Sequence, residues 1–220
     1  THEPWANPFH RDVPPKQDDR HCGVRRFPLD PQLYEYTKLH PYYNEPTSPP
    51  NVPLESAFDK IAFRESWDPK SQYVILDGFA RGKHLHYDAN AILEYVDGGH
   101  RRLIYHDYLT RNTTEHNMVS ILRNGRADTL MPSCAGVRCA VDVGGQVGLV
   151  ATELLDYLGV DCRRSLFWKK GEFLVVMDRL TAREPGEYDA DIVWKMEDRG
   201  AERVDAPGSF VAPRVGQSYL

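Results

Sequence analysis

Side chains that can bind a metal ion or transfer a proton are concentrated between Lys83 and Asn117. This stretch holds five of the nine histidines and several acidic residues, namely His84, His86, Asp88, His100, His106, Asp107, Glu115 and His116. Imidazole nitrogens and carboxylate oxygens are donors that suit zinc and several other divalent ions. We therefore interpret the stretch as a metal-supported site that the rest of the chain positions.

His84, His86 and Asp88 follow a spacing of two residues. In an extended strand, side chains with this spacing leave the same face, so one face would present three donors. A single histidine is more often a hydrogen-bonded surface or core residue than a ligand, and we interpret His100 and His106 in that way. The coincidence of the HxHxD pattern with a returning Asp and a later His-Asn pair is what favours a site.

The Asp97-Gly98-Gly99 sequence predicts a tight hairpin, because glycine tolerates the positive φ angles of such turns. The chain then returns beside the first strand through His106 and Asp107, of which only one can face the side of His84. The loop that follows brings His116 to the same end. A His, Asp and His set across two strands is a credible three-point metal site.

The elements that position these residues are expected to be short strands. Runs rich in β-branched and aromatic residues alternate with Gly, Asp and Asn turns: FDKIAFRES, QYVILDGF, NAILEYVD, RRLIYHDY, NMVSILRN, GQVGLVAT, CRRSLFWK, GEFLVVMDRL and EYDADIVWKM. With about nine strands and almost no helix, the predicted fold class is all-β, as an antiparallel β-sandwich. We assign this sandwich to residues 58–196.

Residues 1–57 carry much of the proline and are expected to form a lead-in draped over a partner surface. One short helix is predicted from Pro31 to Leu39, with an Asp cap and proline at its first position. Tyrosines of the lead-in are expected to anchor it to the core: Tyr34, Tyr36, Tyr42 and Tyr43. Residues 197–220 are weakly patterned and are expected to form an irregular tail.

Composition excludes several classes of function. A net charge of −5 and a pI near 6.0 leave no basic stripe for phosphate backbones, so nucleic acid is not an expected partner. The chain lacks an apolar run of about 18 residues, so neither a transmembrane helix nor a membrane partner is expected. Thr1 stands where an initiator Met is usual, which indicates a processed or excised piece.

The sequence resembles the heparinase II/III-like domain of polysaccharide lyases. The resemblance rests on three strings, FDKIAFRESWDPKSQYVILDGFARGKHLHYDANAILEY, LIYHDYL and TTEHNMVSILRNG, and covers residues 58–126, with a looser match over residues 145–196. The family has an H-G-H-x-D strand, a second strand that ends in Asp and a later His-Asn pair. This chain has Leu85 where the family has glycine. The fold that the resemblance implies is a β-sandwich of the supersandwich type.

Carried over to this sequence, the resemblance implies that His86, Asp107 and His116 hold a divalent metal, with zinc expected and manganese or calcium as alternatives. It implies that His84 is a catalytic residue that faces the substrate. We further expect Arg64 and Asn90 to contact substrate, because guanidinium and amide groups bind carboxylate and sulfate groups well. The alternatives are a surface salt bridge for Arg64 and turn formation for Asn90.

The implied reaction is β-elimination in a uronic-acid polysaccharide, with a uronyl C5-epimerase or a non-catalytic carbohydrate-binding module as alternatives. In the family, the catalytic tyrosine comes from a helical toroid domain, and this sequence has no such helical region. The expected partners are therefore an anionic uronate-containing polysaccharide and a helical toroid domain or partner chain. The resemblance also implies a periplasmic or secreted location.

Overall fold

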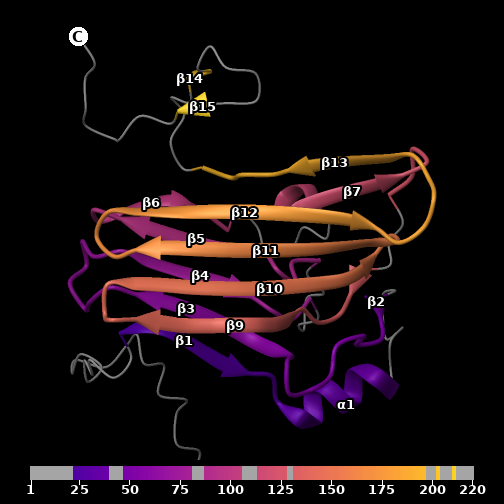
Figure 1. The fold of residues 1–220 in the computed structure, drawn as a ribbon, viewed down its shortest axis with the longest axis horizontal. Helices are drawn as coiled ribbons and strands as arrows, with labels where there is room; N and C mark the ends of the chain where they lie inside the picture. Colours follow the sequence, from indigo (N-terminus) through magenta and orange to yellow (C-terminus); the bar gives the residue numbers. More distant parts are fainter. Residues whose placement is uncertain are drawn as a thin grey trace, which may run out of the picture.

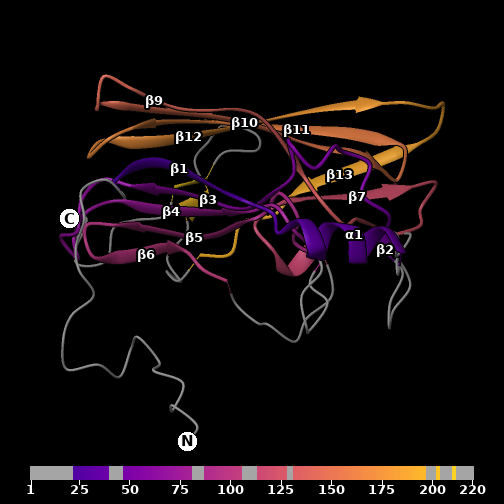
Figure 2. The same cartoon turned by 90° about the horizontal axis from the view of Figure 1, so that it is seen from below.

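The computed structural model describes residues 22–39, 47–80, 87–105, 113–127 and 131–196, together with the backbone of residues 202–203 and 210–211. Strands dominate these residues, and the two largest sheets lie face to face in two layers (Figure 1 and Figure 2). Neighbouring strands within both sheets are antiparallel. The predicted all-β antiparallel sandwich is confirmed.

The first layer is a five-stranded sheet in the order β1-β3-β4-β5-β6. Its strands are β1 Gly23–Pro28, β3 Phe58–Arg64, β4 Tyr73–Asp77, β5 Ile92–Asp97 and β6 His100–Leu103. The β5–β6 hairpin turns at Gly98 and Gly99, which have φ angles of 62° and 80°. The hairpin predicted from the Asp-Gly-Gly sequence is therefore confirmed.

The second layer is a four-stranded sheet in the order β12-β11-β10-β9. Its strands are β9 Gly136–Val143, β10 Val147–Tyr157, β11 Val160–Lys169 and β12 Phe173–Ala182. Along β10 and β11, buried residues alternate with more exposed ones, as expected for strands that cover a core with one face.

Smaller elements complete the described part. β7 Val119–Arg123 pairs with β13 Tyr188–Ile192, and β2 Thr47–Ser48 pairs in parallel with β8 Met131–Pro132. The other short elements are helix α1 Pro31–Leu39, the 3-10 turn η3 Thr113–Glu115, and the pair β14 Glu202–Arg203 with β15 Phe210–Val211. Within the described ranges, no helix has the length and apolar character needed to cross a membrane.

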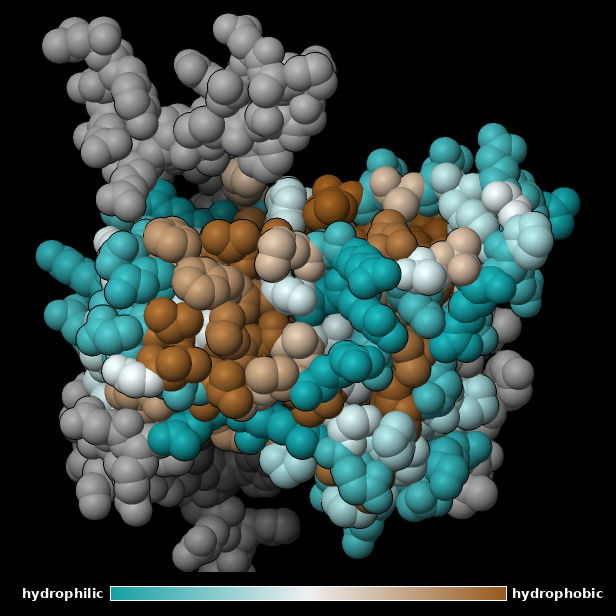
Figure 3. Space-filling model, viewed as in Figure 1, coloured by the Kyte–Doolittle hydropathy of each residue, from teal (hydrophilic) through white to brown (hydrophobic). Residues whose placement is uncertain are grey.

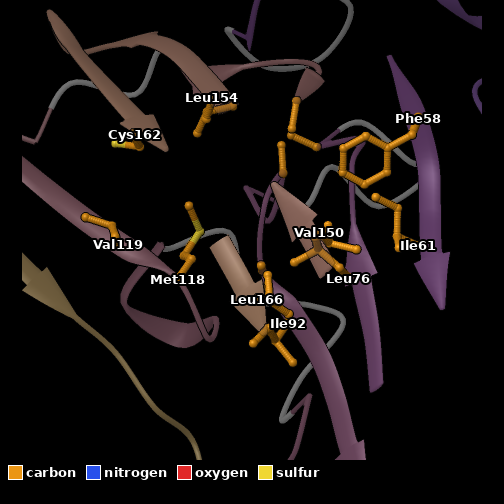
Figure 4. Packing of buried hydrophobic residues seen from close by; sticks show 14 of the residues in the cluster. Phe58, Ile61, Leu76, Ile92, Met118, Val119, Val150, Leu154, Cys162 and Leu166 are labelled. Carbon is orange, nitrogen blue, oxygen red and sulfur yellow. The ribbon is translucent and has the colours of Figure 1, made fainter. Parts of the chain in front are cut away.

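The core lies between the two layers (Figure 4). Side chains from the first layer, including Phe58, Ile61 and Leu76, meet Val150 and Leu166 from the second. Each of these five residues is 2% exposed or less. Burial of one such side chain contributes about 1.5–3 kcal/mol, so the contact between the layers stabilises the fold.

Part of the outer face of the four-stranded sheet is also apolar (Figure 3). Large apolar side chains on this face are exposed on β9, β10 and β12, namely Val141, Val143, Leu149, Phe173, Val175 and Met177. Val141, Leu149 and Val175 lie in one row, because Leu149 pairs with Val141 on β9 and with Phe167 on β11, which in turn pairs with Val175. A contiguous exposed patch of this kind is typical of a surface that another molecule or domain covers.

The N-terminal lead-in contains the predicted helix and two strands that were not predicted, β1 and β2. Helix α1 spans the predicted residues, and the Asp30 Oδ1 atom caps it by accepting from the amides of Gln32 at 2.7 Å and Leu33 at 3.2 Å. Tyr34 is 7% exposed and packs in a buried cluster with Phe79 and Cys134, which confirms that it anchors the lead-in to the core. The same prediction is wrong for Tyr36, which is 42% exposed, and Tyr42 and Tyr43 lie outside the described residues.

Strands β1 and β9 were not predicted, because their sequences GVRRFP and GVRCAVDV interrupt the apolar residues with glycine and charged residues. Both lie at a sheet edge, where a strand forms backbone hydrogen bonds with only one neighbouring strand. Pro28, at the end of β1, is tolerated there for the same reason.

Candidate active site

The predicted site residues divide into those that the structure describes and those that it does not. Asp88, Asn90 and His116 are described. His84, His86 and Asp107 lie outside the described residues. The site is therefore built here from the turn that contains Asp88 and from the segment that contains His116.

The first segment is a turn between β4 and β5. Asn90 has a φ angle of 72°, and its amide donates to the Asp77 carbonyl at 2.8 Å. The Asp77 amide donates in return to the Ala91 carbonyl at 2.8 Å. Asparagine is one of the few residues that adopt this left-handed conformation readily. The turn therefore holds Asp88 beside the end of β4.

Two buried carboxyl groups meet at this turn. Asp77 is 5% exposed and Asp88 is 3% exposed. The Asp77 Oδ1 atom accepts from Lys60 Nζ at 2.9 Å and from the Phe79 amide at 3.0 Å. Burial raises the pKa of the Asp77 carboxyl, and Lys60 opposes this rise.

Asp88 has fewer partners than Asp77. Its Oδ2 atom accepts from the Tyr105 hydroxyl at 3.3 Å, whereas its buried Oδ1 atom has no hydrogen-bond partner among the described residues. Burial raises the pKa of Asp88 well above its ordinary value, and the Asp77 carboxylate raises it further. A proton on Asp88, or a cation close to it, would relieve this unfavourable burial of charge.

His116 lies on the other side of Tyr105. Its ring stacks on the Tyr105 ring, with 5.4 Å between the ring centroids and 19° between the planes. The His116 residue is 1% exposed, and its amide donates to the Thr113 carbonyl of η3 at 3.2 Å. Tyr105 therefore contacts both Asp88 and His116, and it joins the two segments of the site.

Asn117 fixes the segment that carries His116. Its Nδ2 atom donates to the carbonyls of Ile92 at 2.9 Å and Ile104 at 3.1 Å, and its Oδ1 atom accepts from the Lys195 amide at 2.6 Å. Its own carbonyl accepts from the Ile92 amide at 3.1 Å. Asn117 is 1% exposed and is satisfied almost entirely by backbone groups. It therefore ties three chain segments together next to His116.

The two predicted substrate contacts lie in different places. Arg64 is at the far end of β3 from Lys60, about 13 Å away at the rise of an extended strand, and its guanidinium lies 4.4 Å and 4.3 Å from the ring centroids of Trp67 and Tyr73. Asn90 is next to the cluster that Lys60, Asp77, Asp88, Tyr105 and His116 form. It is 5% exposed, and its Oδ1 atom accepts from Thr152. The structure thus gives Asn90 the turn-forming role. It brings Asn90, and not Arg64, to the cluster.

Tyr105, Asp77 and Lys60 were not identified from the sequence as members of this cluster. Their separation along the chain hides their proximity in space. One signal was present: Asp77 directly follows the apolar run of β4 and precedes Gly78, where a carboxylate at a strand end is unusual.

The described part of the site contains groups that a bound cation would stabilise. Among the residues that the structure describes, no three His, Cys, Asp or Glu side chains gather closely enough to hold a metal ion by themselves. The buried imidazole of His116 and the unsatisfied Asp88 oxygen are nevertheless groups that a divalent cation would stabilise.

Comparison with known proteins gives a likeness of fold. No protein-family model and no curated protein sequence matches the chain. A solved heparinase III gene product matches 79% of this chain and 29% of its own, with a TM-score of 0.55 and 16% identity. The heparan sulfate lyase HepC from Pedobacter heparinus matches 76% of this chain and 28% of its own, with a TM-score of 0.52 and 17% identity.

These similarities establish that the sandwich has the fold of heparinase-like structures. The resemblance noted in the sequence is therefore confirmed for the fold. The chain spans less than a third of the length of these solved proteins.

Proposed function

We propose that this chain is the sandwich domain of a polysaccharide lyase that cleaves uronic-acid polysaccharides by β-elimination. The observation that carries the proposal is the fold shared with the heparinase III structure, over 79% of this chain. The buried cluster of Asp88, Tyr105 and His116 supports it, because it lies where the HxHxD and His-Asn motifs end.

The reaction removes a weakly acidic proton next to the uronate carboxylate and expels the glycosidic oxygen from the neighbouring carbon. The site must stabilise the negative charge that develops on that carboxylate, while a base and an acid move the protons. In this proposal His84 faces the substrate and steadies the carboxylate or the leaving oxygen. Arg64 is proposed as a substrate contact at a distance from the cluster, whereas Asn90, which is buried and bonded to Thr152, is proposed to shape the turn.

A divalent metal is proposed to bind His86, Asp107 and His116. Zinc suits two imidazoles and one carboxylate, and manganese or calcium are alternatives. When bound, the metal would supply positive charge close to the substrate carboxylate and to the buried Asp88. His116 would hold its ring in place for this role by stacking on Tyr105.

The complete enzyme is proposed to include a helical domain, on this polypeptide or on a partner chain, that supplies the catalytic base and acid. The solved neighbours are more than three times as long as the part that this chain matches. The apolar outer face of the four-stranded sheet supports the proposal in general terms, because a face of this kind suits contact with another domain or chain.

The test is product formation by the intact protein on a panel of uronate polymers, such as alginate and glycosaminoglycans. Elimination creates an unsaturated sugar that absorbs ultraviolet light, and we expect His84→Ala to abolish this signal. His100→Ala is the matched control, because His100 is exposed at the tip of the β5–β6 hairpin. Absence of the ultraviolet product from every polymer would refute the lyase.

Two further results would identify the alternatives. Deuterium incorporated from solvent at the carbon next to the carboxylate, without chain cleavage, would indicate an epimerase. Binding of a polymer without any turnover would indicate a carbohydrate-binding module.

A further inference from the structure

A polar row crosses the otherwise apolar inner face of the four-stranded sheet. Thr152, Arg164 and Asp178 pair with one another across β10, β11 and β12. The Arg164 side chain is 1% exposed and the Asp178 side chain is 5% exposed. The inward-facing residues beside Arg164 on the same strand are buried and apolar, namely Cys162, Leu166 and Trp168.

The guanidinium of Arg164 has two sets of partners. Its Nε and Nη2 atoms donate to the two carboxylate oxygens of Asp178 at 2.8 Å and 2.9 Å. Its Nη1 atom donates to the carbonyls of Asn90 and Asn117, both at 2.9 Å. The Trp194 ring covers the guanidinium, with 5.6 Å between its centroid and the Arg164 Cζ atom. A side chain of one layer therefore bonds to two segments of the other.

Both of these segments lead into the candidate site. Asn90 belongs to the turn that holds Asp88, and Asn117 directly follows His116. Thr152 adds a second bond to the same turn, because its hydroxyl donates to the Asn90 side chain at 2.5 Å. The polar row thus fixes the spacing between the two chain segments that present the site residues.

A buried ion pair is poor evidence for a role in stability alone. Apolar residues of similar volume often replace such a pair without loss of stability, since two charges must be removed from water to bury it. The hydrogen bonds of Arg164 point to a role in positioning instead. Arginine has a planar fork of donors that can bond a carboxylate on one side and carbonyls on another, whereas lysine has a single nitrogen.

We propose that Arg164 is a positioning residue of the site, which holds the Asp88–Asn90 turn against the His116–Asn117 segment. Asp178 balances its charge and orients the fork. The contact itself is a property of the fold, and only its effect on turnover rests on the proposed lyase function.

The first test measures local opening by amide hydrogen exchange. The reporter is the Ile92 amide, which donates to the Asn117 carbonyl that Arg164 also binds. We expect Arg164→Lys to reduce the protection of Ile92 by about tenfold or more, while amides of β3 and β4 change less than about twofold. Arg163→Lys is the control, because Arg163 is on the same strand with a 43% exposed side chain.

A double variant keeps the test valid if Arg164→Lys does not fold. Arg164→Met combined with Asp178→Met removes both charges and retains most of the volume, so the sandwich is expected to fold. We expect Ile92 to lose protection in this variant as well. A folded double variant in which Ile92 exchanges as in the wild type would overturn the proposal.

The second test uses turnover by the intact protein. We expect Arg164→Lys to lower kcat by about tenfold or more with little change in KM, because the substrate still binds but the site residues are misplaced. An unchanged kcat in a variant whose Ile92 exchanges faster would overturn the link to catalysis. If the wild type forms no unsaturated product, the lyase function fails, and hydrogen exchange alone decides whether Arg164 positions the two segments.

Discussion

Replacement of Asn117 by alanine is expected to destabilise the fold more than any exposed asparagine would. The substitution removes three side-chain hydrogen bonds, to the Ile92 and Ile104 carbonyls and to the Lys195 amide. A hydrogen bond contributes about 1 kcal/mol net, and a buried backbone group that loses its partner costs about 1–3 kcal/mol. Three such bonds at about 1 kcal/mol each give an expected fall of about 3 kcal/mol in the free energy of unfolding.

Urea denaturation followed by circular dichroism measures this loss. The matched control is Asn51→Ala, because Asn51 is exposed and its side chain makes one hydrogen bond, to the Leu155 carbonyl. We expect the control to lose about 1 kcal/mol or less. Asn117→Asp should cost at least as much as Asn117→Ala at neutral pH, since a carboxylate would face two carbonyls. A loss below about 1 kcal/mol for Asn117→Ala would refute the reasoning.

Three further predictions concern the metal, pH and the thiols. His86→Ala should lower metal content and thermal stability together, with His100→Ala as the control; elemental analysis that finds no metal in folded wild type would contradict the metal site. With a chelator present, stability should fall as the pH rises above about 4, because the raised pKa of Asp88 means that the folded state binds more protons than the unfolded state. Asp88→Asn should flatten this fall in urea midpoints between about pH 4 and 8, and an unchanged slope would count against the carboxyl. Burial raises the pKa of Cys134 to about 12, so an alkylating reagent at about pH 8 should modify the exposed Cys139 and leave Cys134 intact in native protein, as mass spectrometry of the peptides would reveal.

Local patterns predicted most of the individual elements. Runs rich in β-branched and aromatic residues, bounded by turn residues, identified β3, β4, β10 and β11. Gly98 and Gly99 marked the β5–β6 hairpin, and both have positive φ angles. The Asp30 cap fixed the start of α1. These features depend on residues close in the chain, so the sequence contains the information directly.

The alternation of inward and outward positions along β11 and β12 contained a further signal, which was not used to predict a buried charge. Along β11 the inward positions read Cys162, Arg164, Leu166 and Trp168, so a charged residue occupies a core position. On β12 the same alternation places Asp178 in line with Leu174 and Val176. Two opposite charges at inward positions of adjacent strands predict a buried pair. The same alternation could not predict the partners of Arg164 outside its own sheet, which are the carbonyls of Asn90 and Asn117.

The sequence by itself determined that this chain forms a β-sandwich, and it predicted that the histidine-rich stretch carries the donors of a site. Only the tertiary structure decided which groups meet there. Asp77 comes beside Asp88 through a turn, Tyr105 lies between Asp88 and His116, and Arg164 reaches across from the other layer. The reason is physical: strand pairing and layer packing join residues far apart in the chain, and a local pattern carries no record of which strand faces which.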